Sequence, residues 1–133
     1  MSNVQILKDL YAAFGRGDVG AVLAAFDPKI EWREAESNPY KPDGKPWFGG
    51  DAITQNLFVK LATEWDGFTV MPQAFHDAGD TVVTEGRYTG TFKETGKGVD
   101  MQFCHVWKFA GGKLTSFQQY CDTAQLLDAA GMR

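Results

Sequence analysis

Two side chains with acid–base chemistry stand among apolar residues in this 133-residue sequence, and Glu34 is the first. Glu34 follows Ile30 and Trp32 at a spacing of two, so the three side chains share one face of an extended strand. An apolar environment disfavours the charged carboxylate and raises its pKa toward neutrality, which is what a general base needs at physiological pH. The alternative is that Glu34 ends its strand at a solvent-exposed rim, because Glu31 and Glu36 show that this segment tolerates acidic residues.

The second side chain is His105, which alternates with Phe103, Trp107 and Phe109 on one face of another expected strand. A histidine in such an apolar row is either a core residue with satisfied hydrogen bonds or an acid–base group that lines a pocket. Taken without other information, the row favours the core interpretation.

The chain contains no other recognisable catalytic motif. It lacks the Gly-x-Ser-x-Gly nucleophile motif, a phosphate-binding glycine loop and the Gly-x-Gly-x-x-Gly dinucleotide motif. Glu34 and His105 would supply too few ligands for a typical metal site, and the remaining histidine, His76, lies at an expected hairpin end. We therefore expect neither a metal ion nor a cofactor.

The composition limits the class of protein. Hydrophobic residues make up 44% of the chain, aromatic residues 14% and charged residues 23%, which excludes disordered and low-complexity proteins. The aromatic excess either fills a core or lines a cavity. The length fits one domain over residues 1–133. The net charge of -4 and the lack of Lys or Arg runs argue against binding to nucleic acid.

The sequence also bears on location. No apolar run reaches the length of about 18 residues that suggests a membrane span. The first residues lack the basic start and apolar stretch of a signal peptide. Cys104 and Cys121 have no metal-type spacing, and we expect both to be reduced and unpaired. These features predict a cytoplasmic protein with no membrane partner.

Two helices, a strand and a third helix are predicted in the N-terminal half. Asp18 suits the N-cap of the second helix, whose apolar face would include Phe26. Pro28 would stop that helix, because proline lacks an amide donor and clashes with a continuing helix. The predicted elements are helices over residues 4–14 and 19–26, a strand over 30–36, a loop over 37–50 and a helix from residue 51.

The predicted loop is unusually aromatic. It carries Tyr40, Trp47 and Phe48, which is too apolar for a plain solvated linker. These three side chains either form a lid over the mouth of a pocket or simply pack beneath the loop.

Four hairpin-linked strands and a short helix are predicted in the C-terminal half. Such strands form an antiparallel sheet, and helices segregated to one side of it make an α+β fold. Asp122 and Gln125 have the N-cap and N3 spacing of a capping box, which favours helix capping over a catalytic role for Asp122. The strands are expected over residues 68–75, 81–92, 99–109 and 114–121, and the helix over 123–130.

The last hairpin determines which glutamine lies beside His105. With a three-residue loop over residues 110–112, His105 would pair with Phe117, and Gln119 would share its face. A loop longer by one residue would place Gln118 on that face instead. We predict Gln119.

The element order and three stretches of sequence resemble the nuclear transport factor 2-like superfamily. The stretches are residues 11–18, the helix after residues 48–50, and residues 103–114. The tail over residues 117–124 is most similar to SnoaL-like proteins, a branch that includes polyketide cyclases and is related to ketosteroid isomerases. The resemblance implies a cystatin-like cone with the order α-α-β-α-β-β-β-β-α, in which a curved antiparallel sheet wraps on helices around an apolar pocket.

The resemblance also implies roles for individual residues. Glu34 matches the general-base carboxylate of ketosteroid isomerases, and His105 matches a second polar pocket position where SnoaL-like cyclases also place a histidine. Where the isomerases carry the first-helix tyrosine of their oxyanion hole, this chain has Leu10, and Tyr11 lies about 100° around the helix. The candidates for ligand contact are Trp32, Tyr40, Trp47, Tyr88, Phe103, Trp107 and Gln119.

Two functional hypotheses follow. The first is an enzyme of isomerase, cyclase or dehydratase type that binds a small apolar carbonyl compound, with Glu34 as base and His105 as acid or electrophilic donor. The second is a non-catalytic module that binds a small ligand or dimerises, which the absence of a tyrosine at Leu10 favours. The family also implies a homodimer through the outer sheet face, at the apolar positions Val82, Thr84, Cys104 and Val106.

Overall fold

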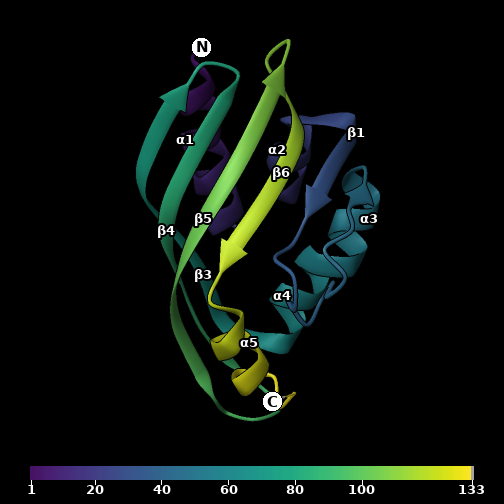
Figure 1. Cartoon of the computed structure of the whole chain (residues 1–133), viewed down its shortest axis with the longest axis vertical. Helices are drawn as coiled ribbons and strands as arrows, with labels where there is room; N and C mark the ends of the chain where they lie inside the picture. The colour runs from purple at the N-terminus through teal and green to yellow at the C-terminus, as the bar shows by residue number, and fades with distance from the viewer. Residues whose placement is uncertain (133) are drawn as a thin grey trace.

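The computed structural model describes residues 1–132, in which helices pack against one face of a single curved sheet (Figure 1). The helices are α1 (Asn3–Gly15), α2 (Val19–Ala24), α3 (Gly50–Ile53), α4 (Val59–Glu64) and α5 (Thr123–Ala129), with a π-helical segment (Thr54–Phe58) between α3 and α4. The strands are β1 (Phe26–Arg33), β2 (Trp47–Phe48), β3 (Trp65–Ala78), β4 (Thr81–Phe92), β5 (Gly98–Ala110) and β6 (Lys113–Cys121). The predicted α+β class is confirmed, and β2 is an addition to the predicted order.

The sheet has the strand order β2-β1-β6-β5-β4-β3. Strands β3 to β6 are joined by antiparallel pairings, as predicted. Strand β1 instead runs parallel to β6, with Trp32 opposite Phe117, so the sheet is mixed at this strand. The sequence pattern did not reveal this pairing because β1 and β6 are far apart along the chain.

Strand β1 covers Phe26–Arg33 rather than residues 30–36. Phe26 is buried at the start of the strand, so its predicted place on the second helix is wrong. Pro28 is tolerated because the pairing of β1 with β6 is irregular between Phe26 and Glu31, where a missing amide donor interrupts no regular ladder. The consequence for the site is that Glu34 directly follows the strand.

The predicted outer face of the sheet needs correction. Val82 pairs with Trp107 and Thr84 pairs with His105, and directly paired residues project to the same face. Val82 and Thr84 are fully buried on the inner face, so their predicted place on the outer face is wrong. Counting alternate residues cannot identify the inner face until one strand is placed against its neighbour.

Candidate active site

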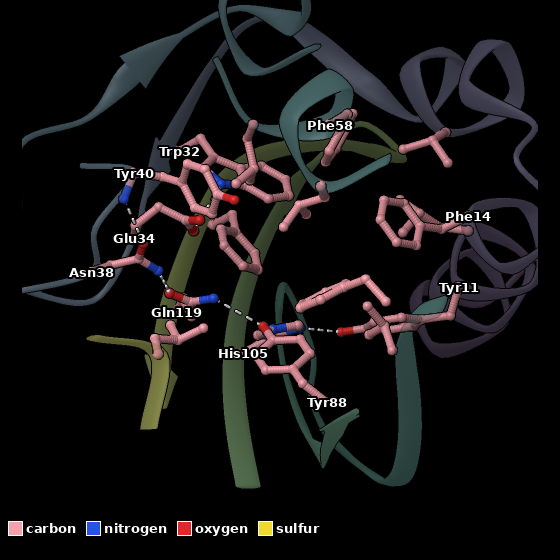
Figure 2. Close-up of a pocket in the computed structure, with 18 of the residues that line it drawn as sticks. Tyr11, Phe14, Trp32, Glu34, Asn38, Tyr40, Phe58, Tyr88, His105 and Gln119 are labelled. Atoms are coloured by element: carbon pink, nitrogen blue, oxygen red, sulfur yellow. Dashed lines mark hydrogen bonds between the residues drawn. The ribbon is translucent and has the colours of Figure 1, made fainter. Parts of the chain in front are cut away.

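A cavity lies between the inner face of the sheet and the helices, and its largely apolar wall includes one row of polar residues (Figure 2). The volume of this cavity is about 60 Å³. None of the described residues that line it is Lys or Arg, so the wall offers no positive charge to an anionic ligand. The polar row consists of Tyr11, Glu34, Asn38, Tyr88, His105 and Gln119.

Glu34 is only 2% exposed, so the alternative of a solvent-exposed rim is wrong. The indole N–H of Trp32 donates a hydrogen bond to Glu34 Oε2 at 3.2 Å. Burial raises the pKa of Glu34 from 4.5 to about 8, against the smaller opposite effect of this hydrogen bond. This shift agrees in direction with the prediction from sequence. At neutral pH, Glu34 is therefore protonated in most molecules.

His105 lies between two phenols. Tyr11 Oη is 2.6 Å from Nδ1 of His105, and the hydroxyl of Tyr88 makes a hydrogen bond with Nε2. Burial lowers the pKa of His105 from 6.5 to about 3, so the imidazole is neutral at physiological pH. Because both ring nitrogens are engaged, a ligand would meet the phenols rather than a free imidazole nitrogen.

Sequence reasoning missed two polar residues of the site, Tyr11 and Asn38. Leu10 and Tyr11 both line the cavity, so the wall spans more of α1 than one helical position. The indole N–H of Trp107 donates to Tyr11 Oη at 2.9 Å. The helical spacing of Leu7, Tyr11 and Phe14 was the signal that could have placed Tyr11 on the inner face.

Gln119 is held in one orientation by the segment that follows β1. Its Oε1 accepts hydrogen bonds from the Ala35 backbone N–H at 3.2 Å and from Asn38 Nδ2 at 2.9 Å. Asn38 is itself oriented, because its Oδ1 accepts from the Tyr40 backbone N–H at 2.9 Å. The Gln119 Nε2 group therefore points to Tyr88 Oη, to which it donates at 3.0 Å.

The β5–β6 register differs from both predicted registers, although Gln119 does share the face of His105. His105 pairs directly with Gln119 rather than with Phe117. The loop has two residues, Gly111 and Gly112, both with positive φ, as a type I′ turn requires. The pairing register then shifts between Lys108 and Phe109. This irregularity places Gln119, rather than Gln118, opposite His105.

The other predicted contact residues divide into two groups. Trp32, Tyr40, Tyr88 and Trp107 line the cavity with Gln119, whereas Trp47 and Phe103 do not. Trp47 belongs to β2 and pairs with Trp32 at the sheet edge, so it is not part of a loop or lid. Phe103 lies beside the site, with its ring stacked on His105 at a centroid distance of 4.0 Å.

Tyr40 lines the cavity and anchors the segment that follows β1. Its hydroxyl donates to Glu64 Oε1 at 2.6 Å and accepts from the indole N–H of Trp65 at 2.9 Å. These contacts attach the segment after β1 to the end of α4 and the start of β3. The loop is therefore fixed by hydrogen bonds at Tyr40.

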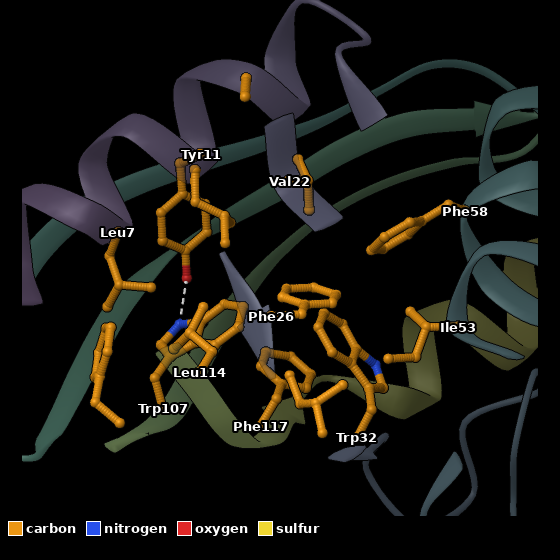
Figure 3. Packing of buried hydrophobic residues seen from close by; sticks show 14 of the residues in the cluster. Leu7, Tyr11, Val22, Phe26, Trp32, Ile53, Phe58, Trp107, Leu114 and Phe117 are labelled. Carbon is orange, nitrogen blue, oxygen red and sulfur yellow. Dashed lines mark hydrogen bonds between the residues drawn. The ribbon is translucent and has the colours of Figure 1, made fainter. Parts of the chain in front are cut away.

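Aromatic rings, among them those of Trp32, Phe58 and Phe117, form part of the apolar wall (Figure 3). Trp32 and Phe117 stack with ring centroids 3.8 Å apart, and Phe117 meets Trp107 at 4.6 Å. Phe58 closes on Trp32 edge-to-face at 5.7 Å. Such walls favour a flat apolar ligand.

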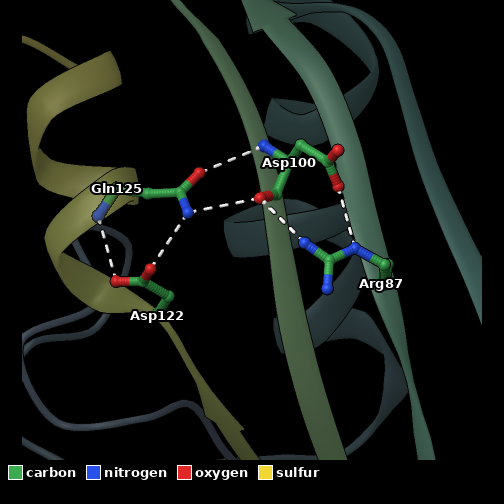
Figure 4. A network of polar contacts seen from close by, with 4 residues as sticks. All are labelled: Arg87, Asp100, Asp122 and Gln125. Carbon is green, nitrogen blue, oxygen red and sulfur yellow. Dashed lines mark hydrogen bonds and ion pairs between the residues drawn. The ribbon is translucent and has the colours of Figure 1, made fainter.

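Asp122 caps α5, as predicted (Figure 4). Its carboxylate accepts from the Gln125 backbone N–H at 3.3 Å and from Gln125 Nε2 at 3.0 Å. Gln125 also bonds the backbone of Asp100 on β5, and Asp100 accepts from Arg87 Nε at 2.9 Å. This network fastens α5 to the sheet, and Asp122 does not line the cavity.

The opposite pKa shifts of Glu34 and His105 predict a stability maximum in mildly acidic solution. Folding raises the pKa of Glu34 from 4.5 to about 8, so the folded protein holds the extra proton between these values and is destabilised as pH rises. Folding lowers the pKa of His105 from 6.5 to about 3, so the unfolded chain holds the extra proton there and stability falls as pH drops. The two contributions cancel between pH 4.5 and 6.5, and outside that range each acts alone with a slope of at most about 1.4 kcal/mol per pH unit.

Urea unfolding measured from pH 3 to pH 8 checks this prediction. The Glu34→Gln variant should lose the decline above pH 6.5 and keep the decline below pH 4.5. A wild-type protein whose free energy of unfolding rises steadily from pH 6.5 to 8 would contradict the buried, protonated state of Glu34.

Within residues 1–132, no helix is both long and apolar enough to cross a membrane. The same residues include no group of three or more His, Cys, Asp or Glu side chains that could hold a metal ion.

Comparisons with known proteins agree with the α+β fold described above. A family model described as the SnoaL-like domain matches residues 7–117. A nuclear transport factor 2-like protein from Burkholderia thailandensis is 40% identical, with a TM-score of 0.91 over 98% of each chain. TerC, co-crystallised with polyporic acid, is 25% identical, with a TM-score of 0.85 over 97% of this chain and 98% of TerC. The candidate polyketide cyclase IdmH from Streptomyces antibioticus shares the fold at 19% identity, with a TM-score of 0.81 over 98% of this chain and 99% of IdmH. No protein of curated function matches.

Proposed function

The chain belongs to the SnoaL-like domain family, and on this premise we propose that it is an enzyme that transfers a proton on a small, flat, neutral carbonyl compound. One observation carries the proposal: the carboxyl group of Glu34 and the phenols around His105 line the same apolar cavity. Removing a proton next to a carbonyl needs a base near the carbon and a hydrogen-bond donor near the oxygen. This cavity offers both.

The wall of the cavity supports the substrate class. Its described lining residues include no Lys or Arg, which disfavours a carboxylate or phosphate ligand. The stacked rings of Trp32 and Phe117 favour a flat shape. The small volume favours a ring of modest size, and the polar row favours a compound with a hydrogen-bond acceptor at one end.

Glu34 is the proposed base. In its ionised form the carboxylate takes a proton from the carbon next to the carbonyl, and the negative charge moves to the carbonyl oxygen as an enolate. A phenol hydroxyl stabilises that oxygen by hydrogen bonding. If the substrate also has a C=C bond conjugated with the enolate, return of the proton to the far carbon of the dienolate gives an isomerisation. Attack of the enolate carbon on a second carbonyl gives a cyclisation, in which the new alkoxide takes the proton back from Glu34.

The known relatives support small-molecule chemistry of this kind. SnoaL-like proteins are related to isomerases and polyketide cyclases through the shared fold. TerC, a relative of similar length, was crystallised with an organic ligand, polyporic acid. These relationships support the reaction class rather than a particular substrate.

Deuterium exchange tests the proposal. Small cyclic ketones, with cyclopentanone as the first member, are incubated with the protein in D₂O, and NMR follows the loss of the protons next to the carbonyl. We expect exchange faster than in buffer alone for ketones that raise the thermal unfolding temperature. Ketones that bind without accelerated exchange would instead support the non-catalytic binding module.

A further inference from the structure

A chain of buried hydrogen bonds runs from α1 to the segment after β1. It joins Tyr11, His105, Tyr88, Gln119 and Asn38, and all five side chains line the cavity (Figure 2). Each of the five is at most 6% exposed. These five buried side chains therefore have to find their hydrogen-bond partners within the protein or in a ligand.

The donor-to-acceptor direction of this series of hydrogen bonds is fixed at both ends. Gln119 must donate to Tyr88 Oη, because its own oxygen is occupied by the N–H groups of Ala35 and Asn38. The indole N–H of Trp107 can only donate, so Tyr11 Oη accepts from it. Both phenol oxygens thus already accept one hydrogen bond from outside the central part of the chain.

The central part contains one hydrogen more than its contacts can use. Tyr11, neutral His105 and Tyr88 each carry one hydrogen on oxygen or nitrogen, which makes three in all. The groups meet in only two contacts, Tyr11 with Nδ1 and Tyr88 with Nε2, and each contact uses one hydrogen. The surplus hydrogen lies on Tyr11 if Nδ1 is protonated, and on Tyr88 if Nε2 is protonated.

Thr84 provides an acceptor for the first arrangement. It pairs with His105 across β4 and β5 and lies beside the phenol of Tyr11. Its Oγ1 is the one buried side-chain N or O atom without a hydrogen-bond partner in the described part of the chain.

The second arrangement leaves the hydrogen facing the cavity. Among the described residues, the hydroxyl of Tyr88 forms side-chain hydrogen bonds only with His105 and Gln119. If His105 donates from Nε2, both of these contacts occupy the oxygen of Tyr88 as acceptor. Its hydrogen then has no partner until a ligand supplies one.

We propose that the carbonyl oxygen of the ligand accepts the surplus hydrogen from Tyr88, and that His105 changes from its Nδ1–H to its Nε2–H tautomer when the ligand binds. In the free protein the surplus hydrogen stays on Tyr11 and is donated to Thr84. Each group holds one hydrogen in both states and the imidazole stays neutral, so hydrogens and charge balance between the two states. The imidazole takes a proton from Tyr88 and passes one to Tyr11, and solvent water removes the extra proton from Tyr11 and returns one to Tyr88. The proposal deepens the proposed function and rests on it for the ligand class, with Tyr88 as a catalytic residue and His105, Tyr11 and Thr84 as positioning residues.

NMR of the histidine side chains tests the tautomer directly. In ¹⁵N-histidine-labelled protein, two-bond nitrogen–proton correlations distinguish Nδ1–H from Nε2–H, and a His76→Gln variant identifies the signals of the second histidine. We expect Nδ1–H in the free protein and Nε2–H with saturating cyclopentanone. Methylenecyclopentane, which has the same ring without the oxygen, should leave the Nδ1–H form unchanged.

Two variants separate this role from a structural one. Tyr88→Phe should weaken cyclopentanone binding about tenfold while leaving methylenecyclopentane binding within about twofold, since only the ketone loses a hydrogen bond. Thr84→Val removes the internal acceptor and should shift the free protein toward Nε2–H without any ligand.

Several results would overturn the proposal. These are Nε2–H in the free wild-type protein, no change of tautomer up to the solubility limit of cyclopentanone, or equal effects of Tyr88→Phe on the two ring compounds. A protein that shows the tautomer change but no deuterium exchange would refute the proposed catalysis and keep the ligand contact. The two failures are therefore distinguishable.

Discussion

Replacing Glu34 with Gln is expected to slow deuterium exchange into a bound ketone by about 10²- to 10⁴-fold, the usual contribution of a general base. Glutamine keeps the size of the side chain and an oxygen that can accept from the Trp32 indole, but it cannot take a proton. Ketone affinity should change by less than about threefold, because the buried carboxyl group is already mostly neutral at pH 7. The measurement is exchange at saturating ketone, followed by NMR.

The matched control is Glu36→Gln, which changes an exposed acid two residues away and should leave exchange unaffected. The pH dependence gives a second check. The pKa of Glu34 is about 8, so the wild-type exchange rate should rise with pH up to that value and level off above it. Exchange that persists in Glu34→Gln, or that is independent of pH from 6 to 8, would show that another group is the base.

The fold was largely predictable because its signals are local. Alternating residues identified strands β3 to β6, and turn residues marked their hairpins. The Asp18 and Asp122 caps depend on hydrogen bonds within three residues, and both were predicted correctly. Glu34 was placed on an apolar face by the same short-range alternation.

The parts that failed depend on pairing between distant segments. Whether Thr84 faces inward is decided by its partner His105, and no local pattern specifies that register. The pairing of His105 with Gln119 required both a two-residue turn and an irregularity after Lys108. Two such departures compensate, so Gln119 was chosen correctly through a pairing that was wrong.

Tyr11 shows why the site itself was harder to predict than the fold. Leu10 occupies the position that matches the oxyanion-hole tyrosine of ketosteroid isomerases, which suggested that α1 supplies no phenol to the site. The cavity instead accepts side chains from neighbouring positions of α1, because Leu10 and Tyr11 both line it. The absence of a tyrosine at Leu10 therefore no longer favours a non-catalytic module.

Replacing Phe117 with Ala is expected to lower the free energy of unfolding by about 3 to 5 kcal/mol, the range for a large buried aromatic side chain. Phe117 is 2% exposed and its ring contacts those of Trp32 and Trp107, with centroid distances of 3.8 and 4.6 Å. Urea unfolding measures the loss. Phe48→Ala is the control, since Phe48 is 62% exposed and its removal should change stability by no more than about 0.5 kcal/mol.

The same substitution should also change which ligand the protein prefers. Phe117 belongs both to the core cluster and to the cavity wall, so its removal enlarges the space next to Trp32 and Trp107. A cyclopentanone that carries a phenyl group should then bind the variant more tightly than the wild type and restore part of the lost stability by mass action. If the variant loses stability but still prefers the smaller ketone, Phe117 supports the core without setting ligand size. If both properties change together, the residues that hold the sheet to the helices also define the substrate.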